Sequence, residues 1–430
     1  MGSQEKMPLV ERLFLVCFFI VPVFLTIQFK INNVAAVRPL YQFGLICAGL
    51  IILILIAAWR EDGQAALKQT KNIIFSRFGA LAAAFFLYVG ASALLAGQQA
   101  FKDFLYFSAW TMISVGALLL LASAAVNMQR FQTWVTVGIV AQAALASVVA
   151  IAVRFGLELD FGEYRLLQAY WVSKRLHGYL GDPTAFGGLV GLALICVASW
   201  RPAGLTVPRV FLLGGLVACL IWSDSRNALL SLVIALGVFF GLTLRFKELA
   251  MAESTLVVSY VIGRLTDEGH TFFTRADEKG SEDSRLYIWN EVIKRLEASN
   301  LVEILFGHGA QQLKHDYRSA FNTTFETLYD YGIVGLVLLG CVVLYAAGML
   351  LSAYKSDRFV SAFGLSLIAY FCVFSQFWTT VPRWFFVYPL FGMILAVVLG
   401  VLATARRHVF KHGGERGPPN SAKPRAAFQE

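Results

Sequence analysis

Residues 333–353 read IVGLVLLGCVVLYAAGMLLSA and contain no charged side chain. This run has the length of about 20 residues that a helix needs to cross the hydrocarbon core of a bilayer, and comparable runs recur along the chain. In that core every backbone amide needs a partner within its own segment, so runs of this kind form helices rather than barrel strands. The sequence therefore predicts an all-α, polytopic membrane protein.

The composition excludes a soluble globular enzyme. Of 430 residues, 58% are hydrophobic and 15% are charged, whereas soluble domains carry about 25% charged residues. The net charge of +9 would suggest nucleic-acid binding in a soluble protein, but membrane topology explains it here. All six cysteines lie in apolar runs without metal-ligand spacing, so neither a disulfide framework nor a zinc site is predicted.

About twelve helices are predicted from the apolar runs. They are 13–29, 40–59, 78–96, 104–126, 133–153, 185–200, 210–222, 228–244, 249–263, 333–353, 359–378 and 384–404. Lys and Arg concentrate in alternate short loops, which by the positive-inside rule puts both termini in the cytoplasm. The run 249–263 is short and contains Glu253; if it lay on the membrane surface, every later assignment would invert.

Two outer segments, 154–184 and 264–325, are much longer than the other loops. Loops above about 12–15 residues usually carry function. The predicted organisation is therefore N-terminal helices with the first long loop (1–263), a large outer loop with short helices (264–325), C-terminal helices (326–404) and a disordered basic tail (405–430), whose Gly, Pro and charge content disfavours folding.

The first long loop contains the cations Lys174 and Arg175, with His177 next to them, and Asp182 precedes the following apolar run. Cations beside a helix start can seat an anion, because the helix N-terminus adds unpaired N–H groups and a positive dipole end. The alternative is a solvated basic loop in which Asp182 or Thr184 caps the helix.

A short turn, Trp222–Asn227, separates two apolar runs on the same side as the long loops. Its Arg226 could snorkel to lipid phosphates. Alternatively, Asp224 and Arg226 join a polar site shared with the two long loops.

The large loop opens on an amphipathic helix, 284–298, for which Asp283 or Ser284 is the natural N-cap. Apolar residues recur at intervals of three and four, so this helix is predicted to lie on the membrane face and to hold Arg285 at a defined depth. These apolar positions are Leu286, Trp289, Val292, Ile293 and Leu296.

Two histidines follow in the large loop. His308 lies in the sequence Phe306-Gly307-His308-Gly309, and His315 lies between Lys314 and Arg318. A loop histidine is more often a surface residue than a base, but the neighbouring cations would help to keep His315 neutral, which is the form that a base requires.

At the start of the next helix, Asn322, Glu326 and Tyr329 share one face at helical spacing. Polar groups at the mouth of a membrane span are costly unless they are paired or hydrated, which favours a functional role. The alternative is a helix-capping cluster with an interfacial tyrosine.

Taken in order, four motifs resemble the O-antigen ligase and polymerase superfamily, membrane glycosyltransferases that act on undecaprenyl-pyrophosphate glycans outside the inner membrane. The likeness covers roughly residues 170–340. The motifs are R-x-x-G-x-x-x-D-P from Arg175 to Pro183, Ser225-Arg226, Ser284-Arg285-x-x-Ile288-Trp289 with Phe306–Gly309, and Asn322 ahead of Gly332-x-x-Gly335.

One departure separates the chain from the ligases of this superfamily. Those ligases usually carry a histidine immediately before the asparagine, where this chain has Phe321. Either a nearby group, namely His308, His315 or Glu326, substitutes for it, or the chain is not a ligase. The superfamily's polymerases rely on arginines in the two long outer loops, which Arg175 and Arg285 would supply, so the polymerase interpretation is preferred.

The resemblance implies that a sugar hydroxyl attacks the anomeric carbon of a lipid-linked oligosaccharide and that undecaprenyl pyrophosphate leaves. Guanidinium groups bind phosphate oxygens bidentately, so Arg175, Arg285 and Arg226 are expected to clamp the pyrophosphate. Neither a metal nor a cofactor is expected. The candidate catalytic residues are Arg175, Arg285, His315 and Glu326, and the candidate substrate-binding residues are Arg226, His177, Asp182, His308, Arg318, Asn322 and Tyr329.

The implied location is the bacterial inner membrane with a periplasmic active site, and a flippase and a chain-length regulator are expected partners. Three alternatives remain: a ligase that transfers glycan to lipid A core, a transporter and a structural subunit of an export complex. Transporters place charged residues or broken helices at mid-span, and the predicted spans contain few of either.

Overall fold

The computed structural model is helical throughout its described part, apart from one small hairpin. In the hairpin, β1 (Asp160–Phe161) pairs antiparallel with β2 (Tyr164–Arg165). The all-α class is therefore confirmed. The described residues are 71, 76–105, 108, 111, 115, 128–156, 160–161, 164–165, 176, 182–200, 207–265, 282–310, 312–313, 320, 322–377 and 392–400.

Ten helices have their bounds within this part of the chain. They are α4 (Arg77–Ala96), α6 (Met128–Arg154), α8 (Pro183–Ser199), α9 (Val207–Trp222), α10 (Arg226–Thr243), α11 (Phe246–Leu265), α13 (Glu282–Ala298), α14 (Leu301–Phe306), α16 (Thr323–Ala353) and α17 (Arg358–Gln376).

Five of the described helices are long and apolar enough to cross a membrane: α4, α6 from Val135 onward, α10, α16 and α17. They confirm helices at the predicted runs 78–96, 133–153, 228–244, 333–353 and 359–378. Helices α8 and α9 are apolar but shorter. The predicted runs 13–29 and 40–59, and most of 104–126 and 384–404, lie outside the described residues, so the count of twelve stays a prediction.

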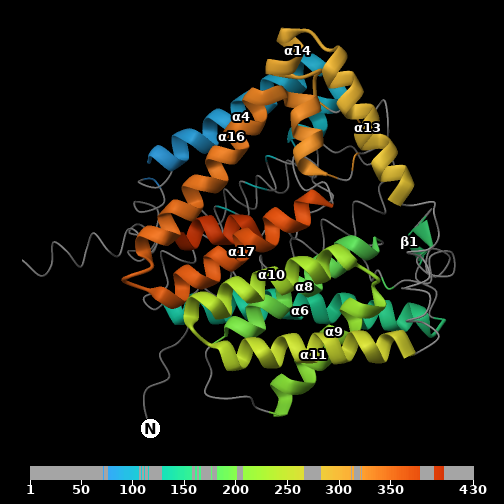
Figure 1. Ribbon diagram of the computed structural model, residues 1–430, viewed down its shortest axis with the longest axis vertical. Coiled ribbons are helices and arrows are strands. Elements are labelled where there is room, and N and C mark those ends of the chain that lie inside the picture. Colours follow the sequence, from blue (N-terminus) through green and yellow to red (C-terminus); the bar gives the residue numbers. More distant parts are fainter. Residues whose placement is uncertain are drawn as a thin grey trace, which may run out of the picture.

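The predicted run 249–263 is helical, as part of α11. This helix packs against α9 and α10 and lies alongside them (Figure 1). It is not among the five candidate spans, since Glu253 and the charged residues of its first turn, Lys247 and Glu248, lower its hydropathy.

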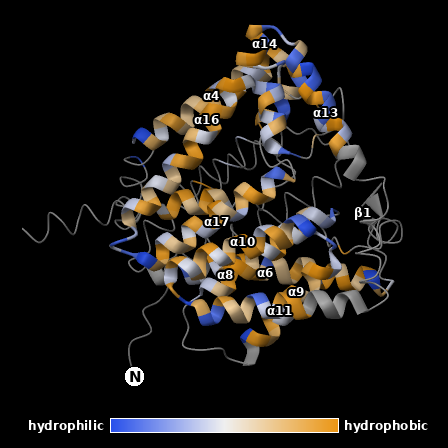
Figure 2. Ribbon diagram, in the orientation of Figure 1, coloured by the Kyte–Doolittle hydropathy of each residue, from blue (hydrophilic) through white to orange (hydrophobic). Residues whose placement is uncertain are grey.

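Helices α6, α8, α9, α10, α11 and α17 form a bundle, and α4 and α16 form a pair outside it, next to α13 and α14 (Figure 1). In the bundle, α8 is almost wholly buried and packs against α6, α9, α10 and α17. Its glycines allow this close approach: Tyr370 of α17 lies on Gly191 and its hydroxyl donates to the Gly188 carbonyl at 2.9 Å. The pair consists of α4 and α16, which pack together and expose apolar surface (Figure 2).

Hydrogen bonds join helix ends at each of the two opposite ends of the bundle. At the first end, the side-chain amide of Asn227, at the start of α10, donates to the backbone carbonyl of Phe377, just after α17, at 2.9 Å. We call this the site end. At the opposite end, the Arg358 guanidinium at the start of α17 donates to the Leu242 carbonyl near the end of α10 at 2.6 Å.

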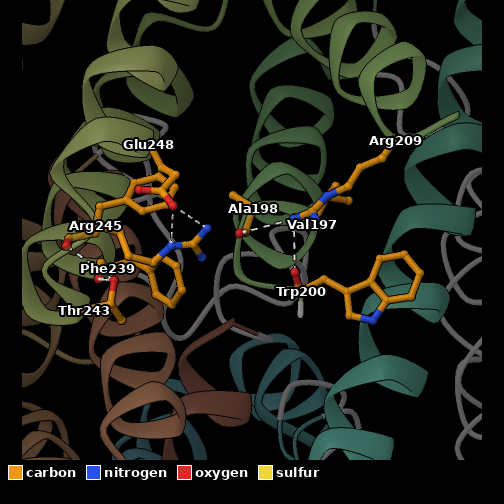
Figure 3. A network of polar contacts seen from close by, with 9 residues as sticks. Val197, Ala198, Trp200, Arg209, Phe239, Thr243, Arg245 and Glu248 are labelled. Atoms are coloured by element: carbon orange, nitrogen blue, oxygen red, sulfur yellow. Dashed lines mark hydrogen bonds and ion pairs between the residues drawn. The ribbon is translucent and has the colours of Figure 1, made fainter. Parts of the chain in front are cut away.

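Arg209 closes the end of α8 at the opposite end of the bundle (Figure 3). Its guanidinium donates to the carbonyl oxygens of Val197 at 2.6 Å and Trp200 at 3.0 Å. The last carbonyls of a helix have no partner within the helix, so a cation there satisfies them and also complements the helix dipole. Close by, Arg245 pairs with Glu248 at 2.9 Å, and both side chains are partly solvent-exposed.

We expect Arg209→Leu to destabilise the protein by about 1–3 kcal/mol, because it removes the guanidinium that donates to the Val197 and Trp200 carbonyls. Thermal unfolding of the purified protein in detergent measures this effect. Arg245→Leu is the matched control, since an exposed ion pair contributes less than about 1 kcal/mol. Equal losses of stability in the two variants would contradict this account.

Candidate functional site

Helix α16 consists of two parts joined at Gly332. This glycine has φ 65° and ψ −169°, a conformation that is accessible almost only to glycine. The part before it, Thr323–Tyr331, carries the polar residues Glu326 and Asp330, and the part after it is the apolar run 333–353. The bend lies beside α14 (Figure 1), so the polar part is set at an angle to the span.

The end of α14 docks on this bend through backbone contacts. The His308 amide donates to the Tyr329 carbonyl at 2.9 Å, and the Gly309 amide donates to the Asp330 carbonyl at 3.1 Å. A Cβ at Gly332 would overlap the Leu305 carbonyl, and a Cβ at Gly307 would overlap the Asp330 carbonyl. The glycines of the Phe306–Gly309 motif therefore permit two backbones to cross in direct contact.

His308 is held between Ser299 and Tyr329. Its ring stacks on the Tyr329 ring with centroids 4.3 Å apart and an angle of 11°. Its Nε2 lies 3.0 Å from the Ser299 hydroxyl, and its Nδ1 lies 3.2 Å from the Tyr329 carbonyl. Because both ring nitrogens contact protein atoms, this arrangement favours a positioning role for His308 over proton transfer.

Tyr329 is fully buried and links the large loop to α16. Its hydroxyl accepts a hydrogen bond from Arg295 of α13 at 3.1 Å. Tyr329 was predicted to lie on a functional face of the helix. In the structure both its ring and its hydroxyl contact other protein groups.

Two buried carboxylates of α16 hold the returning chain of the large loop. Glu326 Oε1 accepts the Ala320 amide at 3.0 Å, and Asp330 Oδ1 accepts the Leu313 amide at 2.9 Å. Both residues are at most 5% exposed. Asp330 was missed by the sequence analysis, although its place four residues after Glu326 puts it on the same helix face.

The structure corrects two predictions about α13. The helix begins at Glu282, so Asp283 and Ser284 lie inside its first turn and neither is the N-cap. Its apolar stripe also does not lie wholly on the membrane face: Val292 is fully buried against the loop and α16, and the Trp289 indole N–H donates to the Ala320 carbonyl at 2.8 Å. Contacts within the protein, rather than lipid, therefore cover these two side chains.

Asn322 joins the start of α16 to the end of α17. Its Oδ1 accepts the Phe325 amide at 3.0 Å, as an N-cap does, and its Nδ2 donates to the Gln376 carbonyl at 2.8 Å. The capping alternative is therefore correct for Asn322, and this residue also brings the large loop to the site end.

The turn between α9 and α10 is confirmed as tight, with Arg226 as the first residue of α10. Asp224 has φ 52°, which is uncommon for a residue other than glycine. The Leu176 amide of the first long loop donates to the Trp222 carbonyl at 3.1 Å. Leu176 therefore joins the first long loop to the turn that carries Arg226.

Asp182 caps α8, as the alternative interpretation of that residue predicted: its Oδ1 accepts the Ala185 amide at 2.8 Å. Near this start of α8, Gly187 packs directly against Ser225. The N-termini of α8 and α10 therefore lie side by side at the site end.

Three long-range hydrogen bonds thus gather separate motifs at the site end: Leu176 to Trp222, Asn227 to Phe377, and Asn322 to Gln376. The predicted residues Arg175, His177, His315 and Arg318 lie outside the described residues, and for Arg285 only the backbone position in α13 is described. Among the residues that are described, no group of three His, Cys, Asp or Glu side chains is arranged to hold a metal ion.

A comparison with protein families matches residues 210–340 to the family described as O-Antigen ligase. The matched range contains Arg226, Arg285, His308 and the polar part of α16, whereas the Arg175 loop precedes it. A comparison with curated proteins gives no match. Over residues 210–340 this helical membrane protein is therefore similar to the O-antigen ligase family, which supports the resemblance to the O-antigen ligase and polymerase superfamily over that range.

Proposed function

We propose that the protein is a glycosyltransferase that polymerises lipid-pyrophosphate-linked oligosaccharide repeat units on the periplasmic side of a bacterial inner membrane. One observation carries the proposal. The three hydrogen bonds at the site end bring together Leu176 of the first long loop, the turn with Arg226 and the start of α16, which come from distant parts of the sequence.

The leaving pyrophosphate gains negative charge during transfer, and the site end offers groups that stabilise it. Arg226 begins α10, where the first amides of the helix lack intrahelical partners and the dipole is positive. A guanidinium keeps its charge at all relevant pH values and matches phosphate oxygens bidentately. We assign Arg226 to the pyrophosphate, together with Arg175 and Arg285.

The acceptor hydroxyl must lose a proton when it attacks the anomeric carbon. His308 contacts protein groups through both nitrogens, and Glu326 accepts a backbone amide, so we assign both to positioning. His315 is then the remaining candidate base of the large loop. A base contributes about 10²- to 10⁴-fold at most, and less where the leaving group is good.

A ligase that transfers finished glycan to lipid A core is the second candidate, and the family match favours it by name. The two activities would share the donor site and differ in the acceptor. Phe321, at the position where the superfamily's ligases carry histidine, is the feature of this chain that favours a polymerase.

The deciding experiment supplies the purified full-length protein, in liposomes, with its lipid-linked repeat unit, and the products are sized on a gel. A polymerase is expected to produce a ladder of longer lipid-linked glycans from this substrate alone. A ligase would produce glycan-bearing lipid A core, and only after lipid A core is added. If neither product forms, the glycosyltransferase proposal is wrong and a role in export remains.

A further inference from the structure

Helix α14, in the large loop, exposes three apolar side chains. Leu301 is 71% exposed, Val302 is 65% exposed and Phe306 is 52% exposed, while the other three residues of the helix, Glu303 among them, are partly buried. A contiguous exposed apolar surface usually marks an interaction site. The three exposed side chains of this short helix are candidates for such a site.

Several backbone groups at the two ends of α14 are paired within the protein. At the start, Asn300 and Glu303 form a reciprocal capping box with both hydrogen bonds at 3.0 Å. At the end, the Phe306 carbonyl accepts the Tyr88 hydroxyl at 3.1 Å, and the Gly307 amide donates to the Glu303 carbonyl at 2.7 Å. Paired backbone groups are what an environment without water requires.

The apolar surface of α14 continues onto two candidate membrane spans. The adjoining end of α4 exposes Leu94 (62%) and Leu95 (88%), and α16 exposes Val337 (55%). In each of these spans only 17% of the apolar window is buried inside the protein. Helix α14 packs against α16, and α16 packs against α4, and Figure 2 shows apolar residues on α14 and on the adjoining ends of both spans. The exposed apolar side chains therefore belong to three helices that are in contact.

We propose that α14 lies in the bilayer, at the level of the outermost acyl carbons of the leaflet at the site end, and that lipid acyl chains cover Leu301, Val302 and Phe306. Lipid is the occupant that the contact with α4 and α16 favours, because acyl chains are what would cover the exposed apolar side chains of two candidate spans. The contact anchors the large loop at headgroup depth. It does not depend on the proposed function, although it would place a lipid-linked pyrophosphate and the loop at the same height.

The first experiment labels Val302→Cys with the fluorophore NBD in the full-length chain, with the native cysteines replaced by alanine, in phosphatidylcholine liposomes. Glu297→Cys, at an exposed position of α13, is the matched control. We expect blue-shifted emission at position 302 that is quenched by doxyl-labelled acyl chains, and emission at 297 that is quenched by aqueous iodide. Iodide quenching at both positions, without doxyl quenching at 302, would overturn the proposal.

A second copy of the chain would give a different result: a blue shift at 302 that grows with the protein-to-lipid ratio and is insensitive to doxyl lipids. That outcome also overturns the proposal.

A second experiment needs no substitution. The unmodified protein is reconstituted with lipids that carry a diazirine on the acyl chain, irradiated and analysed by mass spectrometry. We expect adducts within 301–306 as well as at 94–95. Adducts at 94–95 with none at 301–306 would show that α14 stays outside the acyl region.

Discussion

Arg226→Ala is expected to lower the rate of glycan transfer about 10²- to 10³-fold, the usual cost of removing one preorganised donor to a developing anion. Arg226 lies at the first turn of α10, at the end of the bundle where three distant segments meet. The proposed function assigns its charge to the departing pyrophosphate, so kcat and kcat/KM should fall together. Initial rates with the lipid-linked repeat unit measure the effect.

Arg358→Ala is the matched control, because Arg358 also begins a long apolar helix but lies at the opposite end, where it donates to the Leu242 carbonyl. We expect that variant to transfer glycan at a rate within a few-fold of the unmodified protein, once rates are normalised to folded protein. If Arg226→Ala retained as much activity as Arg358→Ala, Arg226 would not hold the leaving group.

Gly332→Ala is expected to destabilise the large loop and to abolish transfer. Its φ of 65° with ψ of −169° strains any residue with a side chain by about 1–3 kcal/mol. In addition, the new Cβ would overlap the Leu305 carbonyl and the Gly307 amide nitrogen. The Phe306–Gly309 motif would have to separate from α16, which would break the His308 contacts. Thermal unfolding and limited proteolysis of the large loop measure the result.

Gly340→Ala tests whether the effect belongs to the bend. Gly340 lies in the same helix, and a Cβ there would meet nothing within 4 Å. Alanine favours a helix over glycine by about 1 kcal/mol, so this variant should be neutral or slightly more stable. If Gly332→Ala and Gly340→Ala behaved alike, the bend would have no special role.

Some of the site could be predicted because it rests on local signals. Asp182 and Asn322 were both recognised as potential caps, since an Asp or Asn ahead of an apolar run satisfies the first amides of a helix. The turn at Arg226 was recognised because two apolar runs flank six mostly polar residues. In each case the deciding contact lies within a few residues.

The surroundings of α13 and His308 could not be predicted because their partners are remote in sequence. Val292 has the spacing of a residue that faces lipid, yet it is buried by Leu313, Ala320 and Tyr329. His308 lies between two loop glycines, and nothing in that short sequence indicates that Ser299 and Tyr329 contact both of its nitrogens. Periodicity tells which side of a helix is apolar, but not whether protein or lipid covers that side.

By itself, the sequence determined that the chain is an α-helical membrane protein, and it located the candidate spans that the structure describes, because hydropathy and helix capping depend on neighbours within a few residues. The tertiary structure decided which polar segments meet. The Asn227 to Phe377 hydrogen bond joins residues 150 positions apart, and the Gly307 to Gly332 crossing depends on two backbones in direct contact. Such contacts form only after the helices have packed, so no short stretch of sequence encodes them.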